Sequence, residues 1–239
     1  MLTQEKKVPS MNYAEYTTLV YGTKMIGKSS LLSQVPDNLF INAGGGLEAI
    51  SCYEEKVSTW DKFLNVGAEF IAGQHKFKAI TFDTIDRTHK MCQDYMMAKL
   101  NIIHPADLAF GKGWDLVKSE FLRPIMKLVL SDYQVFFISH SKEIEITTRT
   151  AKFSKTVPSM SDGLYGMISS LSGIILFYDI TDTEQGEVRL LRTSPSEKWI
   201  AGDRTGRLSN YGDIIMEAPP VDNWNKIQKI FNGEIVKEI

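Results

Sequence analysis

Short apolar runs separated by amphipathic stretches occupy most of the chain. The runs at 16–21, 39–42, 77–82 and 135–140 are nearly continuous in apolar or β-branched residues, which is typical of strands buried on both faces. Between them apolar residues recur at helical spacing, as at Trp60, Phe63, Leu64, Ala68 and Ile71. Strands that alternate with helices in this way predict an α/β fold, with a mostly parallel sheet flanked by helices.

The C-terminal part of the chain has a different pattern. Apolar runs at 174–178 and 188–192 are joined by the polar segment 181–186, which predicts an antiparallel hairpin that extends the sheet. Segment 142–163 is polar and has no clear period, so we expect a mobile loop there. The last stretch, 219–239, predicts a short amphipathic helix that packs on the core or docks on another protomer. We therefore divide the chain into an N-terminal segment (1–15), a core (16–216) and a helical tail (217–239).

Composition narrows the class of protein. The 239 residues are 43% hydrophobic and 23% charged, which allows a sizeable hydrophobic core. The net charge is −2, so the chain has no overall basic field that would attract nucleic acid. Cys52 and Cys92 are isolated, which suits a reducing compartment, and the 4 histidines form no zinc signature. No apolar run approaches the ~20 residues that span a membrane. We therefore expect a cytoplasmic protein with no membrane partner.

Segment 22–29 carries the most specific chemistry of the chain. It has the pattern G-x-x-x-x-G-K-[ST], the phosphate-binding loop (P-loop), between a predicted strand and the first turn of a predicted helix. In such loops backbone N–H groups surround the phosphates, the lysine reaches the β- and γ-phosphates, and the serine hydroxyl holds Mg²⁺. A glycine-rich turn that carries a lysine by chance is the alternative. The residues expected to bind ATP are Gly22, Thr23, Lys24, Met25, Ile26, Gly27, Lys28, Ser29 and Ser30.

Asp83 is the second candidate of the phosphate site. It ends the apolar run 79–83, where P-loop ATPases place a carboxylate that positions Mg²⁺. We therefore expect Ser29 and Asp83 to share Mg²⁺, and Lys28 and Asp83 to act in catalysis. The alternative is that Asp83 only begins a turn with Thr84 and Asp86.

The order of the segments resembles a family of phage ATPases. The P-loop is followed by a strand ending in a glycine turn, Asp83-Thr84, a Trp-containing helix, a strand ending in Ser139-His140, and a tail with 191–195 and 203–206. Over 16–216 this order resembles the RecA-like ATPases of phages, the Sak-type single-strand annealing proteins. The resemblance implies a RecA-like core that binds ATP, Mg²⁺ and single-stranded DNA, and forms homo-oligomers with ATP between subunits. It also implies a role in phage DNA recombination in the host cytoplasm, beside a single-strand DNA-binding protein.

The resemblance also assigns roles outside the P-loop. His140 is expected to sense the γ-phosphate and relay its state to the next segment, although a histidine that merely caps a strand fits as well. Arg204, or else Lys198, is expected to reach the γ-phosphate in a neighbouring subunit. Segment 142–163 is expected to bind DNA, with a solvated surface loop as the alternative. Its DNA-binding candidates are Lys142, Arg149, Lys152, Phe153 and Lys155.

The chain departs from the recombinase pattern at two places. Recombinase cores resemble each other in placing a water-activating glutamate just after the second strand, and Gly44 falls at that position. Glu48, one helical turn further on, is the candidate catalytic substitute. Segment 201–204 also lacks the lysine that relatives commonly carry before the arginine. Slow or absent hydrolysis therefore remains open.

Two other functions compete with a DNA-binding ATPase. A nucleotide-dependent assembly protein with little hydrolysis would account for Gly44. A small-molecule kinase would account for the P-loop, but kinases usually carry an arginine-rich lid, and segment 142–163 holds one arginine.

Overall fold

The strands form one mixed sheet. The computed structural model describes residues 4–149, 151–183, 186–219 and 221–236. Within these residues the strand order is β10-β8-β7-β1-β5-β4-β2-β3, with β6 paired to β5 and β9 paired to β7. The strands are β1 (Thr18–Gly22), β2 (Asn38–Asn42), β3 (Tyr53–Lys56), β4 (Ala79–Asp83), β5 (Gln134–Thr147), β6 (Lys152–Pro158), β7 (Ile174–Thr183), β8 (Gly186–Arg192), β9 (Gly202–Asp203) and β10 (Ile214–Met216).

The direction of the strands confirms the predicted fold class. β1 lies at the centre and runs parallel to both β5 and β7. The parallel pairing continues through β4, β2 and β3. On the other side, β7 pairs antiparallel with β8, and β8 with β10. The chain therefore has a mostly parallel α/β sheet with an antiparallel C-terminal extension.

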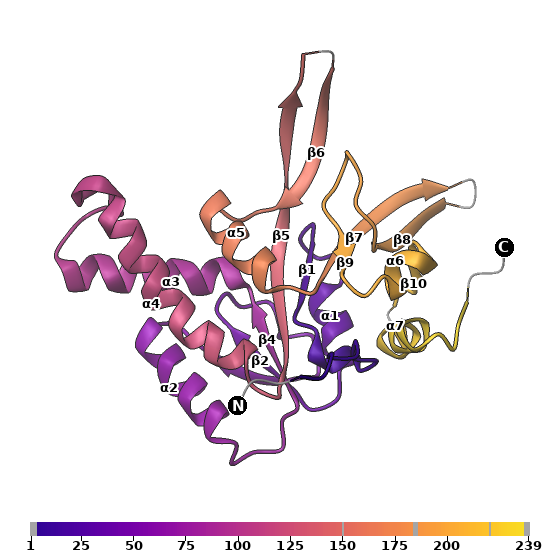
Figure 1. The fold of residues 1–239 in the computed structure, drawn as a ribbon, viewed down its shortest axis with the longest axis horizontal. Helices are drawn as coiled ribbons and strands as arrows, with labels where there is room; N and C mark the ends of the chain where they lie inside the picture. The colour runs from indigo at the N-terminus through magenta and orange to yellow at the C-terminus, as the bar shows by residue number, and fades with distance from the viewer. Residues whose placement is uncertain (1–3, 150, 184–185, 220, 237–239) are drawn as a thin grey trace.

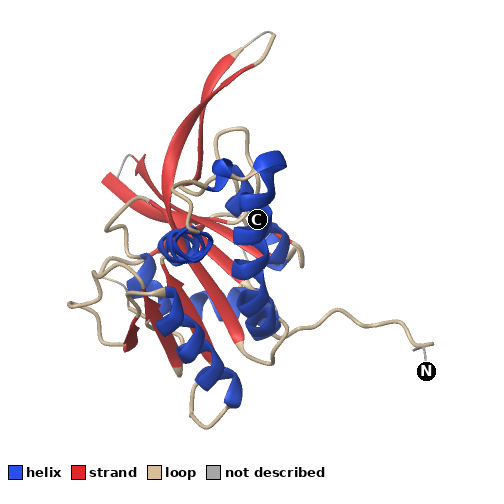
Figure 2. Cartoon of the chain, turned by 90° about the vertical axis from the view of Figure 1, so that its left-hand side faces the viewer, coloured by secondary structure: helices blue, strands red, loops and turns tan. Residues whose placement is uncertain are grey.

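Helices cover both faces of the sheet (Figure 1, Figure 2). One hydrophobic core lies beneath α2, α3, α4 and α5, and a second lies beneath α1, α6 and α7. None of the helices in the described part of the chain has the length and apolar character that crossing a membrane requires. The helices are α1 (Lys28–Leu32), α2 (Trp60–Ala72), α3 (Ile85–Leu100), α4 (Lys112–Val129), α5 (Asp162–Leu171), α6 (Arg207–Tyr211) and α7 (Asn223–Asn232), with short 3-10 turns η1 (Tyr13–Glu15), η2 (Pro105–Asp107) and η3 (Ala109–Gly111).

The central strands β1 and β4 are buried at every position because successive side chains enter different cores. In β1, Leu19 packs in the core of α2–α5, whereas Val20 packs in the core of α1, α6 and α7. Phe137 and Phe136 of β5 divide in the same way. Both faces of a sheet covered on two sides need apolar residues, which explains the continuous runs in the sequence.

Segment 142–163 differs from the mobile loop that its composition predicts. β5 continues past the sheet and pairs antiparallel with β6 from Ser141–Pro158 to Thr147–Lys152, and α5 follows. In Figure 1 this β5–β6 hairpin projects from the body of the molecule. Most of its residues beyond Ser141 are exposed or half-buried, so the strands carry no continuous apolar run. Hydrogen bonds between the two strands hold the hairpin, and the hydrophobic pattern does not report them.

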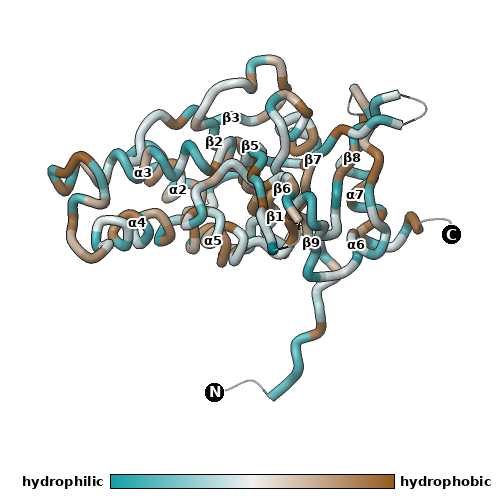
Figure 3. The backbone as a smooth tube through the Cα atoms, turned by 90° about the horizontal axis from the view of Figure 1, so that it is seen from above, coloured by the Kyte–Doolittle hydropathy of each residue, from teal (hydrophilic) through white to brown (hydrophobic). Residues whose placement is uncertain are grey.

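The C-terminal tail packs on the core of the same chain. Trp224 of α7 makes edge-to-face ring contacts with Tyr13, at 5.1 Å between centroids, and with Phe136 of β5, at 5.5 Å. Phe231 contacts Tyr13 from the other end of the helix, at 4.9 Å. Before Tyr13, residues 4–9 are exposed and lead away from the body, as Figure 3 shows. Residues from both ends of the chain therefore complete one core.

Candidate nucleotide-binding site

The P-loop lies at the carboxyl end of the central strand. β1 ends at Gly22, which lies beside His140 of β5 and Tyr178 of β7. A Cβ atom on Gly22 would come within 2.4 Å of the Tyr178 carbonyl oxygen, so the close approach of these strands requires glycine. Gly27 has a φ of 113°, in the left-handed region that favours glycine, and it directly precedes α1. Both glycines of the motif are therefore required by the backbone.

Lys28 is buried within the loop that it belongs to. Its side chain is 5% exposed, and Nζ donates to the carbonyl oxygens of Gly22, at 3.0 Å, and Thr23, at 2.7 Å. Burial lowers the pKa of the Lys28 ammonium to about 8, while the carboxylates of Asp83 and Asp86 act in the opposite direction. An anionic phosphate beside Nζ would restore the preference for the charged form.

Ser29 and Asp83 meet as the sequence predicts. The Ser29 hydroxyl donates to Oδ2 of Asp83 at 2.5 Å. Burial raises the pKa of Asp83, against the opposing effects of the Ser29 hydrogen bond and Lys28. One hydroxyl and one carboxylate are a hard-oxygen pair that suits Mg²⁺, which takes its other ligands from water and phosphate. The described residues contain no group of three or more His, Cys, Asp or Glu that could hold a metal without a nucleotide.

A cavity of about 310 Å³ opens beside these residues. The P-loop forms one wall, the Gly44–Gly46 turn a second, and the β4–α3 junction with His140 a third. Asp83 is the only carboxylate among the lining residues of the described chain. The lining residues are Lys24, Met25, Gly27, Lys28, Ser29, Ser30, Gly44, Gly45, Gly46, Ile50, Asp83, Thr84, Arg87 and His140.

His140 lies between the cavity and the β5–β6 hairpin. Its Nδ1 is buried without a hydrogen-bond partner among the described residues. Burial lowers its pKa, the charge of Lys28 lowers it further, and Asp86 opposes them. A neutral ring with an unused polar atom beside the P-loop can accept or donate a hydrogen bond to a bound group. Its carbonyl also accepts from the Ser159 N–H at 2.7 Å, which ties it to the residue after β6.

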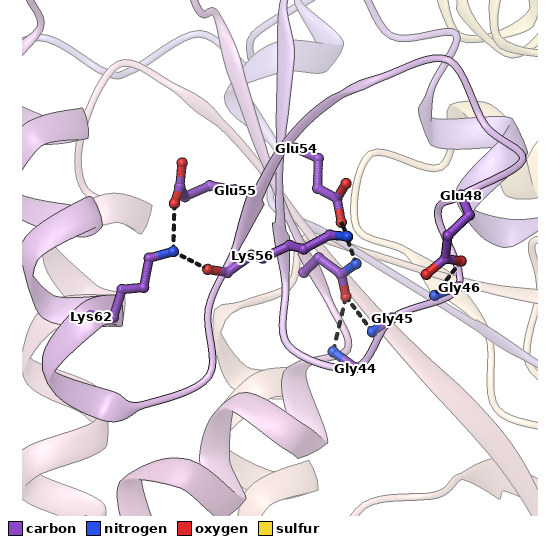
Figure 4. A network of polar contacts seen from close by, with 9 residues as sticks. Gly44, Gly45, Gly46, Glu48, Glu54, Glu55, Lys56 and Lys62 are labelled. Atoms are coloured by element: carbon purple, nitrogen blue, oxygen red, sulfur yellow. Dashed lines mark hydrogen bonds and ion pairs between the residues drawn. The ribbon is translucent and has the colours of Figure 1, made fainter.

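The Gly44–Gly46 turn is held by Asn42, which sequence reasoning did not identify. Figure 4 shows this network. Asn42 Oδ1 accepts from the backbone N–H groups of Gly44, at 2.9 Å, and Gly45, at 2.7 Å. Its Nδ2 donates to Oε1 of Glu54 on β3 at 2.5 Å. An asparagine that ends a strand before three glycines is the sequence signal, because Asx side chains commonly hold such turns.

Glu48 lies outside the lining of the cavity. It is exposed, and Oε2 accepts from the Gly46 N–H at 3.0 Å, so it holds the turn from its outer side (Figure 4). The structure thus brings Lys28, Ser29, Asp83 and His140 together and leaves Glu48 apart. Its proposed catalytic role stays a prediction.

Neither candidate cation of the tail lines the chain's own cavity. Arg204 follows β9, which pairs with the first residues of β7, at the opposite end from Tyr178 beside the P-loop. It is exposed and donates to the Ser170 carbonyl at 3.2 Å. Lys198 is exposed as well. Arg204 is thus placed away from the cavity of its own chain, and the expected role of Arg204 or Lys198 in a neighbouring subunit stays a prediction.

The candidate DNA-binding residues are distributed along the β5–β6 hairpin. Lys142 Nζ donates to the Met160 carbonyl at 2.9 Å, and Lys152 pairs with Glu145 at 2.8 Å. Arg149 and Lys155 form no ion pair with the described residues. Phe153 is half-buried and lies opposite Ile146 across the strand pair.

Comparisons with known proteins agree with a P-loop ATPase. A family profile described as "AAA domain" matches residues 14–205, and no curated protein matches the chain. Similar solved structures include the flagellar accessory protein FlaH from Methanocaldococcus jannaschii, with 9% identity, a TM-score of 0.45 and 86% of each chain covered. The KaiC-like protein PH0186 from Pyrococcus horikoshii OT3 has 9% identity and a TM-score of 0.44, with 85% of this chain and 90% of that chain covered. Because the profile spans most of the sequence and includes the P-loop, Asp83 and His140, the chain belongs to the AAA domain family of P-loop ATPases.

Proposed function

We propose that this protein binds ATP with Mg²⁺ in the cavity between the P-loop and β4, and hydrolyses it slowly. One observation carries the proposal: Lys28 and Ser29 at the start of α1 and Asp83 at the end of β4 converge on one cavity. The P-loop N–H groups would bind the phosphates and Lys28 would neutralise the β- and γ-oxygens. Ser29 and Asp83 would hold Mg²⁺, which supplies charge neutralisation between those phosphates.

We expect slow ATP hydrolysis because, among the described residues, the cavity has no free carboxylate that could activate the attacking water. Asp83 is committed to Ser29, and no second carboxylate lines the cavity within the described residues. Glu54 and Glu48 hold the glycine turn from outside the cavity. Without a base beside the attacking water, positioning and electrostatic stabilisation remain as sources of rate.

The finer proposal is that the protein binds single-stranded DNA through the β5–β6 hairpin and acts in phage recombination in the host cytoplasm. The support is the continuity of β5, which carries His140 at the cavity and Lys142 two residues further, and which pairs with β6, where Lys152 and Lys155 lie. A change at His140 can then bias the hairpin along one strand. Arg204 of a neighbouring subunit would complete the ATP site in a homo-oligomer, and a single-strand DNA-binding protein is the expected protein partner.

A second candidate is a nucleotide-dependent assembly protein without turnover, because Asp83 stands as the lone carboxylate in the lining of the described site. A small-molecule kinase has less support, since segment 142–163 is a paired hairpin and a helix, and a lid for an acceptor needs a mobile segment.

Phosphate release from ATP, with and without single-stranded DNA, distinguishes these functions. The proposal predicts slow release that DNA accelerates and that Lys28→Ala abolishes. Tight ATP binding without release would favour the assembly protein. ATP-dependent phosphorylation of a nucleoside or metabolite in an acceptor screen would favour the kinase.

A further inference from the structure

Arg87 occupies the space that a side chain at position 44 would need. It lies in the first turn of α3, is exposed, and lines the phosphate cavity. A Cβ on Gly44 would come within 2.9 Å of Arg87 Cδ, 3.2 Å of Nε and 3.5 Å of Cζ. The φ of Gly44 lies outside the left-handed region. A side chain at position 44 would therefore displace the Arg87 side chain from its present position.

The cavity holds more positive than negative charge. Lys24, Lys28 and Arg87 line it, and Asp83 is its one carboxylate within the described chain. Arg87 forms no ion pair with the described residues, whereas Asp83 already accepts from Ser29. The charge of Arg87 also contributes, after burial and Lys28, to the lowered pKa of His140. The guanidinium of Arg87 is thus a positive charge at the cavity that forms no ion pair within the described residues.

We propose that Arg87 contacts the terminal phosphate of the bound nucleoside triphosphate, and that Gly44 leaves the space for it. The inference rests on the proposed ATP site and adds a residue to it. The P-loop would bind the inner phosphates, and Ser29 and Asp83 would hold a metal ion that neutralises charge on the β- and γ-phosphates. The terminal phosphate therefore extends toward the wall formed by Asp83, Gly44 and Arg87. A guanidinium offers two parallel N–H donors to phosphate oxygens.

This assignment gives Gly44 a different meaning from a missing glutamate. The position carries no carboxylate because a cation from the same subunit fills that wall. Arg87 makes the site bind a triphosphate more tightly than a diphosphate. Such a preference suits a protein that binds ATP tightly and hydrolyses it slowly.

Calorimetric titration with a non-hydrolysable ATP analogue and with ADP, both with Mg²⁺, tests the role of Arg87. We expect Arg87→Ala to lower the affinity for the analogue about 10- to 100-fold, and the affinity for ADP less than about threefold. Arg87→Lys, which keeps the charge without the fork, should fall between. Lys90→Ala is the control, because Lys90 lies on the same helix, outside the cavity, and pairs with Asp94 at 2.7 Å.

Equal losses for the analogue and ADP, or no loss, would overturn the assignment while leaving the ATP site intact. Failure of the wild type to bind either nucleotide would overturn both proposals.

A double-mutant cycle tests the role of Gly44. Gly44→Ala displaces the Arg87 side chain. It should therefore lower the affinity for the analogue about tenfold when Arg87 is present, and have little effect in the Arg87→Ala background. Equal losses in both backgrounds would show that Gly44 does not act through Arg87. Unfolding temperatures of all variants check that each change leaves the fold intact, and the exposure of both residues predicts that it does.

Discussion

Ser29 on α1 donates a 2.5 Å hydrogen bond to Asp83 at the end of β4. The two residues are separated by 54 positions in the chain, and β5 lies between β4 and β1, the strand that leads into the P-loop. The bond joins the P-loop to the wall that faces it, and it brings together the two oxygens that we propose as Mg²⁺ ligands. The cavity is therefore lined by Lys28, Ser29 and Asp83 together.

Asp83→Asn should abolish Mg²⁺-dependent nucleotide binding and stabilise the nucleotide-free protein. The raised pKa means that ionised Asp83 costs stability, a cost that is absent below its ordinary pKa and grows as pH rises through the raised value. The amide can still accept from Ser29 without the buried charge. We expect a gain of about 0.5–2 kcal/mol in the free energy of unfolding at neutral pH. Denaturant titration of the wild type and the variant measures this difference. A variant that is less stable than the wild type would contradict the prediction.

Nucleotide binding at alkaline pH should take up a proton at Lys28. The folded-state pKa is lowered to about 8, so half of the Lys28 side chains are neutral at that pH, and a phosphate restores the charged form. We expect an uptake of about half a proton per nucleotide at pH 8, rising toward one by pH 9. Calorimetry in buffers of different ionisation enthalpy measures it. Lys28→Arg, which stays charged, should remove the uptake, and its persistence there would contradict the assignment.

The same lowered pKa affects stability without nucleotide. The unfolded lysine binds a proton that the folded one has lost between pH 8 and 10.5, so the Lys28 contribution to stability rises with pH across that window. Lys28→Met should flatten this part of the pH profile of the unfolding free energy. An unchanged slope in the variant would show that Lys28 is not the titrating group.

Asn42→Ala should release the Gly44–Gly46 turn. It removes two acceptor contacts, from the Gly44 and Gly45 N–H groups, and leaves Glu54 without its amide donor. We expect a loss of about 1–3 kcal/mol in stability and faster hydrogen exchange at these two amides. Glu48→Ala is the matched control, since it removes one contact to Gly46 at the exposed side. Equal exchange rates in Asn42→Ala and the wild type would be contrary to the network.

Arg149 and Lys155, which form no ion pair in the part of the hairpin that the structure describes, should determine DNA affinity. Arg149→Ala with Lys155→Ala should lower the salt slope of single-stranded DNA binding by about 1.4, because each lost phosphate contact on a single strand changes it by about 0.7. Lys152→Ala should have a smaller effect, since Lys152 pairs with Glu145. Fluorescence anisotropy of a labelled oligonucleotide over a salt series measures both. Equal slopes in all variants would place DNA binding elsewhere.

Trp224→Ala should destabilise the whole protein. Trp224 is 6% exposed and contacts both Tyr13 and Phe136, so its loss leaves a cavity that costs about 3–5 kcal/mol. Trp114→Ala, at a position that is 45% exposed, should cost far less. Thermal unfolding of the two variants compares them, and equal effects would indicate that the tail is not part of the core.

Local patterns explain which parts of the molecule the sequence could predict. The P-loop spacing, and Asp83 at the end of an apolar strand, follow from contiguous residues, and the central strands from their two-sided burial. β3 has mostly exposed side chains and pairs through its backbone, so Tyr53–Lys56 shows no hydrophobic signal. The extension of β5 past Ser141 could not be predicted for the same reason, because its side chains are mostly exposed and it pairs through its backbone. The contact between Gly44 and Arg87 joins residues 43 positions apart through space, and no local pattern contains it.

The most direct test of the ATP site is equilibrium binding of a fluorescent ATP analogue to the wild type and to Lys28→Ala, with Mg²⁺ and with a chelator. We predict saturable binding to the wild type that the chelator weakens at least tenfold, and that Lys28→Ala reduces by at least as much. Absence of saturable binding, or equal affinity of the two proteins, would contradict a nucleotide site built on Lys28, Ser29 and Asp83.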